Sequence, residues 1–288
     1  MILQVGWLPW QDGINIILQC SHTVIIFFLQ NYNLMTLSEA IILGSIQGIT
    51  EFLPISSSGH LVIAQSLLGL KLPGNIIEVV THLGTLFSVI IVFRKDIMQL
   101  LCDLKNPLTK KYILFLFIGT IPALIIGLST KSIILLFFES IKIVSFSLIF
   151  TGFILYLSKK RNKKKSFISY KNSLLIGISQ ALAIMPGISR SGITISTGIL
   201  LGMNAKEAAR FSFLLAIPAI SGAGLITAID IVDQPVQISY QIMFAALVSS
   251  FVVGYLSLKW FLGILENGKL HFFGFYCISI GLIILIAI

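Results

Sequence analysis

The chain concentrates reactive side chains in one short stretch, TEFLPISSSGH, which runs from Thr50 to His60. Ser56 and Ser57 precede His60 by four and three residues, so on a helix these side chains would share a face. A hydroxyl beside an imidazole is a typical pairing of a nucleophile with its general base. Glu51 could orient His60, act as an acid or base, or hold a divalent ion. The stretch therefore predicts a site that handles a bound group.

A second polar stretch, PGISRSGIT, spans residues 186–194 and carries Arg190 among small residues. In both stretches a serine-rich turn precedes an apolar half-helix. Serine is a favoured N-cap, and a helix N-terminus offers free N–H groups and partial positive charge. Two such ends facing each other predict an anion site, to which the guanidinium of Arg190 adds a fork suited to phosphate. The milder alternative is that Arg190 only pairs with Glu51 as a structural ion pair.

The composition of the chain places both stretches in a membrane. Of the 288 residues, 56% are hydrophobic and 11% are charged, whereas a soluble domain carries about 25% charged residues. The apolar runs are long and lack strand-like alternation, so they predict helices and not a β-barrel. The net charge of +9 is explained by loops that set membrane orientation, and it does not indicate nucleic acid as a partner.

The apolar segments predict an all-α polytopic membrane protein with about six spanning helices. Four segments are too short to cross a bilayer of roughly 30 Å at 1.5 Å per residue. They form two pairs around polar turns, and each pair predicts a re-entrant hairpin, over about 37–70 and 173–202. The segments fall at about 37–50, 61–70, 76–93, 112–129, 133–157, 173–185, 193–202, 207–229, 239–262 and 271–288.

Basic residues set the expected orientation. They gather in the linkers 94–111 and 158–171, which should therefore be cytoplasmic. If both linkers are cytoplasmic, the apolar segments that precede and follow them fix the side of each hairpin. The first hairpin then enters the membrane from the outside, and the second enters from the cytoplasm. Because the first hairpin carries the nucleophile candidates, we expect catalysis at the outer face of the membrane.

The two hairpins are also related in sequence. A shift of 133 residues aligns them without a gap, so that Gln47 meets Gln180, Ser56 meets Ser189 and Gly59 meets Gly192. We interpret this as a duplication, with one repeat over about 37–157 and the other over about 172–288. Since the copies enter from opposite faces, the repeat is inverted, and such repeats place a site near the bilayer midplane where the hairpin tips meet.

The first 34 residues differ from the rest. Their apolar run is short and interrupted by polar residues, and it has neither a basic start nor a cleavage pattern, so it is a poor signal peptide. Met35 opens a segment, MTLSEAIILG, that reads as a natural start. We expect residues 1–34 to be an extension, either a misassigned start or a peripheral helix, and residues 35–288 to form one membrane-embedded domain.

The motif GSIQGITEFLPISSSGH, followed downstream by PGISRSGITIS, resembles the undecaprenyl-diphosphate phosphatase family, also called the bacitracin-resistance family. The similarity runs from about Leu37 to the end of the chain. It implies a hydrolase that converts undecaprenyl diphosphate to undecaprenyl phosphate and thereby recycles the carrier lipid for cell-wall synthesis. It also implies the inverted repeat with two re-entrant hairpins, and a divalent cation, Mg²⁺ or Ca²⁺.

The resemblance also carries residue roles. The catalytic positions of the family match Glu51, Ser57, His60 and Arg190, with Glu51 the candidate metal ligand. Ser189 and Thr194 match phosphate-contacting positions. The full set of expected substrate-binding residues is Gln47, Ser56, Ser58, Gly59, Gly187, Ser189, Ser191, Gly192 and Thr194.

One position departs from the pattern. Many members carry a second glutamate where this chain has Gln47, four residues before Glu51. A neutral amide oxygen weakens any scheme in which two carboxylates of that helix hold a metal. Sequence also leaves open whether Ser57 or His60 is the nucleophile.

Two other classes of function compete with the phosphatase. A lipid-phosphate flippase or transporter would use the same inverted repeat and the same Arg190, but passage does not need the serine, histidine and glutamate of the first tip. A structural scaffold would not need an arginine at mid-membrane, where its insertion costs roughly 3 kcal/mol or more. Membrane lipids are expected partners in every case, and a homo-oligomer is left open.

Overall fold

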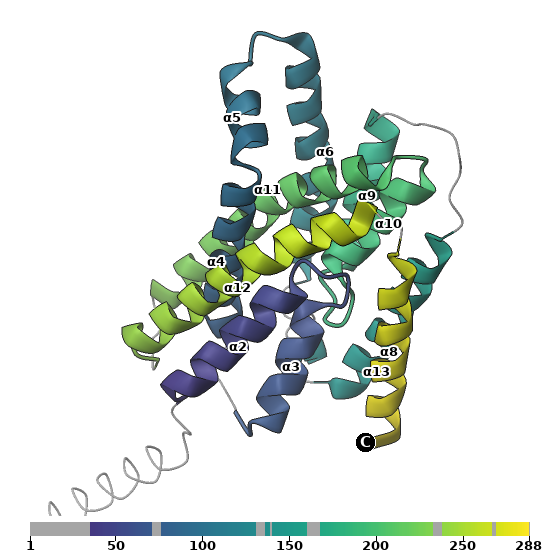
Figure 1. Ribbon diagram of the computed structural model, residues 1–288. Helices are drawn as coiled ribbons and strands as arrows, with labels where there is room; N and C mark the ends of the chain where they lie inside the picture. Colours follow the sequence, from purple (N-terminus) through teal and green to yellow (C-terminus); the bar gives the residue numbers. More distant parts are fainter. Residues whose placement is uncertain are drawn as a thin grey trace, which may run out of the picture. The chain divides into compact units, whose positions relative to one another are not determined.

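The computed structural model describes residues 35–70, 76–130, 136–138, 140–159, 168–232, 238–266 and 269–287 (Figure 1). Contacts divide the chain into two units, Met1–Met35 and Thr36–Ile288, and the account below concerns the second. The expectations for residues 1–34, and the basic run 160–167, lie outside the described residues. Within the described ranges all regular secondary structure is helical, which confirms the all-α prediction.

The described residues form a series of helices. In chain order they are α2 (Leu37–Thr50), α3 (Ser57–Leu67), α4 (Ile76–Val92), α5 (Arg94–Cys102), α6 (Pro107–Ser129), α8 (Ile141–Leu157), α9 (Tyr170–Leu182), α10 (Arg190–Leu200), α11 (Ala205–Val232), α12 (Tyr240–Glu266) and α13 (His271–Ala287).

Fewer helices than the predicted six are long enough to cross a membrane. Among the described residues, α6, α11 and α12 pass by length and composition, and α4 with α5 would be a fourth if the 70° bend between them lies within one span. The helices α8 and α13 have 17 residues each, which is about 26 Å at 1.5 Å per residue and short of a roughly 30 Å hydrocarbon core. The chain is a helical membrane protein, and the described residues support three or four of the predicted six or so spans by this criterion.

The two predicted hairpins are pairs of short helices in contact with each other. α2 packs on α3, and α9 packs on α10. The breaks contain Pro54 and Pro186, and proline lacks the N–H that would continue the helical ladder. After each break a serine restarts the helix: the Ser56 hydroxyl accepts from the amide of Gly59, and Ser189 caps α10 in the same way.

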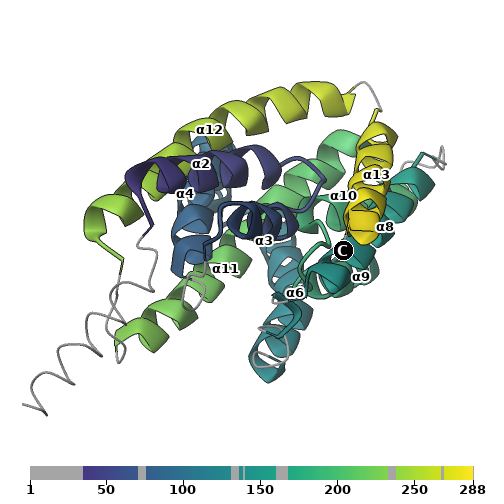
Figure 2. The same cartoon turned by 90° about the horizontal axis from the view of Figure 1, so that it is seen from below.

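Each hairpin is held by a long helix from the other half of the chain. α2 packs along α12 and α9 packs along α6, while α8 pairs with α13; Figures 1 and 2 show α2 beside α12 in both views. Glycines allow the close approach: Gly44 lies against Ala246 of α12, and Gly177 lies against Gly119 of α6. Such small-residue contacts are typical of helix packing in lipid, where hydrophobicity alone does not favour association.

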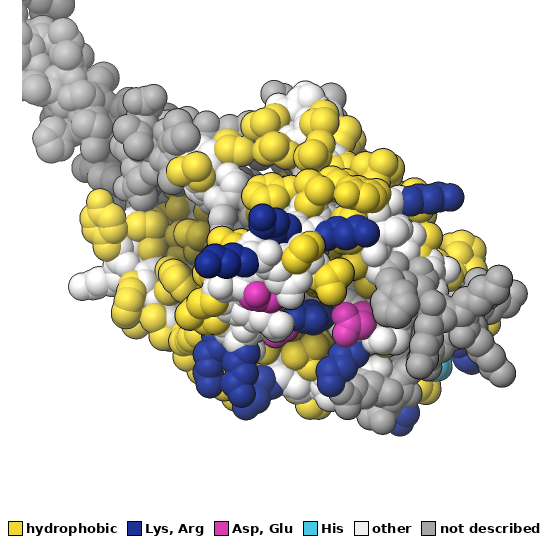
Figure 3. Space-filling view, turned by 90° about the horizontal axis from the view of Figure 1, so that it is seen from above, with side chains coloured by type: hydrophobic (Ala, Val, Ile, Leu, Met, Phe, Trp, Pro, Cys, Tyr) yellow, Lys and Arg dark blue, Asp and Glu magenta, His cyan; other side chains and the backbone are white. Residues whose placement is uncertain are grey.

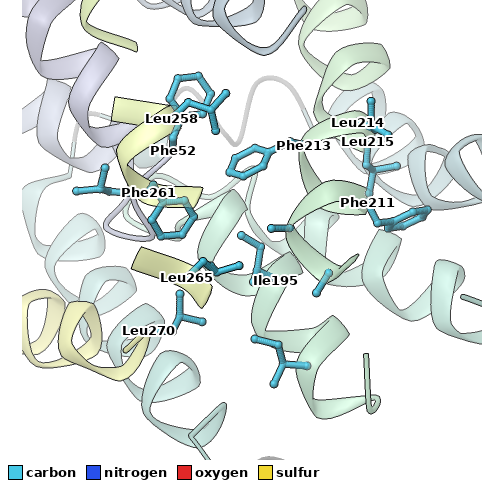
Figure 4. Close-up of a cluster of buried hydrophobic side chains, with 14 of the residues drawn as sticks. Phe52, Ile195, Phe211, Phe213, Leu214, Leu215, Leu258, Phe261, Leu265 and Leu270 are labelled. Atoms are coloured by element: carbon cyan, nitrogen blue, oxygen red, sulfur yellow. The ribbon is translucent and has the colours of Figure 1, made fainter. Parts of the chain in front are cut away.

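A cluster of buried aromatic rings supports the first hairpin tip. Phe52 lies in the break after α2 and meets Phe213 of α11 edge-on at 5.8 Å between ring centroids; Phe213 in turn packs on Phe261 of α12 and on Phe93 (Figure 4). Phe52, Phe213 and Phe261 are fully buried. Rigid side chains from α11, from α12 and from the junction of α4 with α5 therefore fix the position of the residue before Phe52, which is Glu51.

The surface is divided by residue type. Many large apolar side chains on α6, α8, α12 and α13 are exposed, as expected where lipid is the solvent. Figure 3, which views the molecule from the end to which α5 and α6 project in Figure 1, shows lysine and arginine side chains gathered on one face with hydrophobic side chains around it. This separation is the pattern of a membrane protein with one basic face.

Candidate functional site

The two hairpin tips meet through a buried ion pair. Glu51 is the C-cap of α2 and Arg190 is the first residue of α10. Arg190 Nη2 donates to Glu51 Oε1 at 2.5 Å, and only 15% and 5% of the two side chains are exposed. The pair that sequence offered as the milder alternative is thus present. The ion pair joins the tips of the two hairpins, although the two residues are 139 positions apart in sequence.

The hydroxyl of Ser57 belongs to the same cluster. Ser57 Oγ donates to Glu51 Oε2 at 2.6 Å, so the carboxylate accepts from Arg190 on one oxygen and from Ser57 on the other. This differs from the expected pairing of Ser57 with His60. Ser57 is the first residue of α3, and its side chain turns back toward the end of α2 instead of along α3. The group placed to take a proton from Ser57 is therefore Glu51.

His60 is held on both ring nitrogens by other partners. Nδ1 lies 2.8 Å from the carbonyl oxygen of Ser56, and because a carbonyl only accepts, Nδ1 carries the proton. In the neutral ring Nε2 then accepts from the hydroxyl of Tyr276, at 2.9 Å. The Tyr276 ring also stacks on the imidazole, with centroids 5.7 Å apart and planes 10° from parallel. Glu51 does not orient His60, as one sequence-based option had it.

Ser56 has an unusual backbone that serves this arrangement. Among the described residues it is the one non-glycine residue with positive φ, at 69°, a conformation that costs of the order of 1–3 kcal/mol. The same residue caps α3 with its hydroxyl and offers its carbonyl to His60. The strain thus coincides with a residue that organises the tip.

Gln47 and His82 extend the cluster behind Glu51. Gln47 Nε2 donates to Glu51 Oε2 at 2.9 Å and lies 2.6 Å from His82 Nδ1, which is itself 3.3 Å from Glu51 Oε2. Gln47 is fully buried, and its Oε1 has no hydrogen-bond partner among the described residues. The sequence offered no direct contact for His82; only the packing of α4 against α2 reveals it.

The serines and glycines of the tips make close contacts between the two hairpins. Ser191 Oγ donates to the carbonyl of Leu53 across the tips. A Cβ on Gly59 would lie 3.1 Å from the Cα of Gly187, so the tips touch backbone to backbone. Three further expected residues also lie at the tips. The hydroxyl of Ser58 is 3.3 Å from that of Ser56, and the hydroxyl of Ser189 accepts a hydrogen bond from the amide of Gly192.

Two residues that the sequence did not single out position the second tip. Thr151 of α8 donates to the carbonyl of Gly187 at 3.0 Å and accepts from the amide of Ser189 at 3.1 Å. Ser212 of α11 shares a 2.6 Å hydrogen bond with the hydroxyl of Thr194. Thr194 is fully buried and also donates to the carbonyl of Arg190, so its hydroxyl supports Arg190 in this arrangement. No local signal marks either partner.

The donor set around Glu51 fits a divalent cation that arrives with a phosphate ligand. No group of three or more His, Cys, Asp or Glu side chains that could hold a metal occurs in the described part of the chain. The unpartnered, buried Gln47 Oε1 and the Glu51 carboxylate are nevertheless two oxygen donors on one helix end. Mg²⁺ commonly takes one or two protein oxygens and completes its shell with water and phosphate oxygens.

The fold and the site together define a class of protein: a helical membrane protein with a buried cluster of polar and charged side chains between two broken helix pairs. The chain belongs to the family of the bacitracin resistance protein BacA, which matches residues 40–283.

The similarity to individual relatives extends over nearly the whole length of each relative. An undecaprenyl-diphosphatase of Halothermothrix orenii is 40% identical over 257 residues, covering 88% of this chain and 98% of the relative. Proteins with that name from Methanosphaera stadtmanae (38% identical; 88% of this chain, 98% of the relative) and Bacillus cereus (undecaprenyl-diphosphatase 1; 40%, 85% and 96%) are similar.

Proposed function

We propose that this chain hydrolyses undecaprenyl diphosphate to undecaprenyl phosphate and inorganic phosphate, recycling the carrier lipid for peptidoglycan synthesis and conferring bacitracin resistance. The observation that carries the proposal is the Ser57–Glu51–Arg190 cluster at the meeting point of two helix N-termini. The shared name of relatives about 40% identical supports the same substrate.

Substrate binding uses the positive end of the cluster. The terminal phosphate of the diphosphate takes the place of Glu51 as the partner of Arg190, whose guanidinium suits two phosphate oxygens at once. The amides at the start of α10, and those at the start of α3, add donors and the positive ends of two helix dipoles. The prenyl chain lies among the lipid-exposed helices. Exchange of one anion for another leaves Arg190 paired throughout.

The chemical step follows from the hydrogen bond between Ser57 and Glu51. Ser57 Oγ attacks the terminal phosphorus while Glu51 accepts its proton, and the bond from phosphorus to the bridging oxygen breaks, so that undecaprenyl phosphate leaves. Water then attacks the phosphoserine, which releases phosphate and restores the hydroxyl. For His60 to act as the nucleophile instead, its Nε2 would first have to leave Tyr276.

A divalent cation is part of the proposal. Glu51 and the Oε1 atom of Gln47 would hold it, and when bound it supplies charge neutralisation to the diphosphate oxygens. With one carboxylate instead of two, we expect weaker cation binding than in a chain with glutamate at position 47.

The proposed setting is a bacterial inner membrane, with two re-entrant hairpins related by an inverted repeat and the site open to the outer face. The helix boundaries support a duplication: α9, α10 and α12 each begin 133 residues after α2, α3 and α6, respectively. The packing is also reciprocal, because α2 lies on α12 and α9 lies on α6. The basic face in Figure 3 supports a cytoplasmic side at the end to which α5 and α6 project in Figure 1.

The decisive experiment is phosphate release from undecaprenyl diphosphate by purified protein in detergent, with Mg²⁺, Ca²⁺ or EDTA. We expect wild-type protein to release phosphate, and Ser57→Ala and Arg190→Ala to lower the rate by at least a thousandfold, with His60→Ala included for comparison. Ser66→Ala, at an exposed serine further along α3, is the matched control. Lipid binding without release under any cation would instead support the flippase or transporter.

A further inference from the structure

A second polar feature lies at the other end of α4, at the bend into α5. Between this bend and α12 the surface is hollowed by about 180 Å³, and the walls are formed by Ile91, Val92, Arg94, Lys95, Tyr255 and Lys259. The lining thus combines three basic side chains with an apolar floor. None of these residues belongs to the cluster around Glu51.

The positive charge of this hollow is not neutralised by the residues that line it. No acidic side chain is among them. The nearest carboxylate in sequence, Asp96, is engaged elsewhere, since its Oδ1 lies 2.6 Å from Nε of Arg210. The Lys259 ammonium lies over the ring of Tyr255, 5.2 Å from the centroid, an arrangement that holds the charge at the wall of the hollow. Three cations with no acidic side chain beside them in the lining favour an anionic ligand.

The hollow lies where an apolar helix gives way to polar sequence. α4 ends at Val92, and the basic pair Arg94–Lys95 follows directly. On α12, Lys259 is followed by Trp260, which is 58% exposed, and exposed tryptophan is typical of the membrane interface. One turn further into each helix the exposed residues are apolar, with Phe87 at 49% and Leu256 at 61%. The hollow therefore lies at headgroup depth with acyl-chain surface beside it.

Buried rings stand between this hollow and the proposed catalytic site. Phe93, which precedes Arg94, packs on Phe213, and Phe213 packs on Phe52, which follows Glu51. Phe52 and Phe213 are fully buried. A ligand in the hollow would thus be separate from the diphosphate bound at Arg190.

We propose that this hollow binds the phosphate headgroup of an anionic phospholipid, with the acyl chains lying along the exposed apolar residues of α4 and α12. Basic pockets between membrane helices at the cytoplasmic side suit such headgroups. A phosphate group provides the negative charge, and the flanking apolar surface distinguishes a lipid from free phosphate, which has no chain to bury.

The test is lipid retention by the detergent-purified full chain, measured by native mass spectrometry during titration with phosphatidylglycerol, phosphatidylcholine or inorganic phosphate. The variant R94Q/K95Q/K259Q removes the three charges of the hollow. K105Q/K110Q/K171Q removes three exposed basic residues that do not line it and is the matched control. A single change, Lys259→Gln, serves if the triple variant is not obtained folded.

We expect phosphatidylglycerol to bind at least tenfold more tightly than phosphatidylcholine. Each basic residue near an anionic lipid contributes about a fivefold factor in affinity, so the triple variant should lose about a hundredfold, Lys259→Gln about fivefold, and the control less than threefold. Equal losses in the triple variant and its control would overturn the proposal. So would equal affinity for the two lipids, or inorganic phosphate binding as tightly as phosphatidylglycerol. None of these measurements depends on hydrolysis.

Discussion

His60 and Tyr276, 216 residues apart in sequence, share a hydrogen bond of 2.9 Å between Nε2 and the phenolic oxygen, and their rings stack. Tyr276→Phe keeps the stacking and removes the hydrogen bond. Because such a bond contributes about 1 kcal/mol to stability, we expect Tyr276→Phe to lower the free energy of unfolding, measured by denaturant titration, by about that amount. Tyr156→Phe, at another exposed tyrosine, is the control. An unchanged free energy of unfolding would show that this hydrogen bond does not stabilise the first hairpin tip.

Removal of Arg190 should affect stability as well as activity. Arg190→Ala leaves the buried Glu51 carboxylate without its cation, and breaking a buried pair in this way costs about 3–5 kcal/mol. We expect a lower unfolding midpoint in denaturant titrations. Adding Glu51→Gln should restore much of the stability but none of the phosphate release. Recovery of activity in the double variant would contradict the proposed role of both residues.

Ser57 and Ser58 offer a direct comparison of two adjacent hydroxyls. Ser57 donates to Glu51, whereas Ser58 lies near Ser56 only. Ser57→Ala should abolish a burst of undecaprenyl phosphate release and any covalent phosphoenzyme trapped with labelled substrate. Ser58→Ala should keep at least a third of the wild-type rate. A labelled phosphoenzyme in Ser57→Ala would point to His60 as the nucleophile.

Gln47→Glu places a second carboxylate beside Glu51, whose Oε2 is 2.9 Å from the Gln47 amide. Two like charges at this distance attract a divalent ion to neutralise them. We expect the Mg²⁺ or Ca²⁺ concentration that gives half-maximal phosphate release to fall about tenfold or more. Gln180→Glu, at the corresponding residue of the second hairpin, is the control. A half-maximal concentration that does not move would remove Gln47 from the cation site.

Gly187 should not tolerate a side chain. Its φ is +91°, and an added Cβ would collide with the carbonyl of Val144 and lie 2.6 Å from the Cβ of Ser147. We expect Gly187→Ala to lower the free energy of unfolding by about 2–4 kcal/mol and to reduce activity by separating the tips. Gly222→Ala is the control, since nothing lies within 4 Å of its Cβ and alanine favours a helix by about 1 kcal/mol. Equal unfolding midpoints for the two variants would count against tight contact at the tips.

The local features of the site were predictable from sequence, and its long-range contacts were not. The serine N-caps at Ser56 and Ser189, the helix breaks, and a pairing of Arg190 with Glu51 all follow from residue types and spacing. The predicted Ser57–His60 pair failed because α3 begins at Ser57, so that its hydroxyl turns back to Glu51. Spacing rules for a helix interior do not hold at its first residue.

The partners whose contacts the sequence did not predict share one property. His82, Thr151, Ser212 and Tyr276 come from helices distant in sequence, and each contacts a tip residue through a single side chain. A lone threonine or tyrosine in an apolar helix carries no pattern that distinguishes it from the many others. Only the packing of α4, α8, α11 and α13 around the tips selects these four.

The packing of α2 on α12 also has a consequence for how the protein is made. About 190 residues separate the end of α2 at Thr50 from the start of α12 at Tyr240, and ribosomes add about 5–20 residues per second. The first hairpin must therefore wait about 10–40 s in the insertion machinery or the bilayer before its partner helix exists. During that interval Glu51 has no arginine from α10 for most of the time, so the hairpin depends on chaperoning by the translocation apparatus or lipid until translation nears completion.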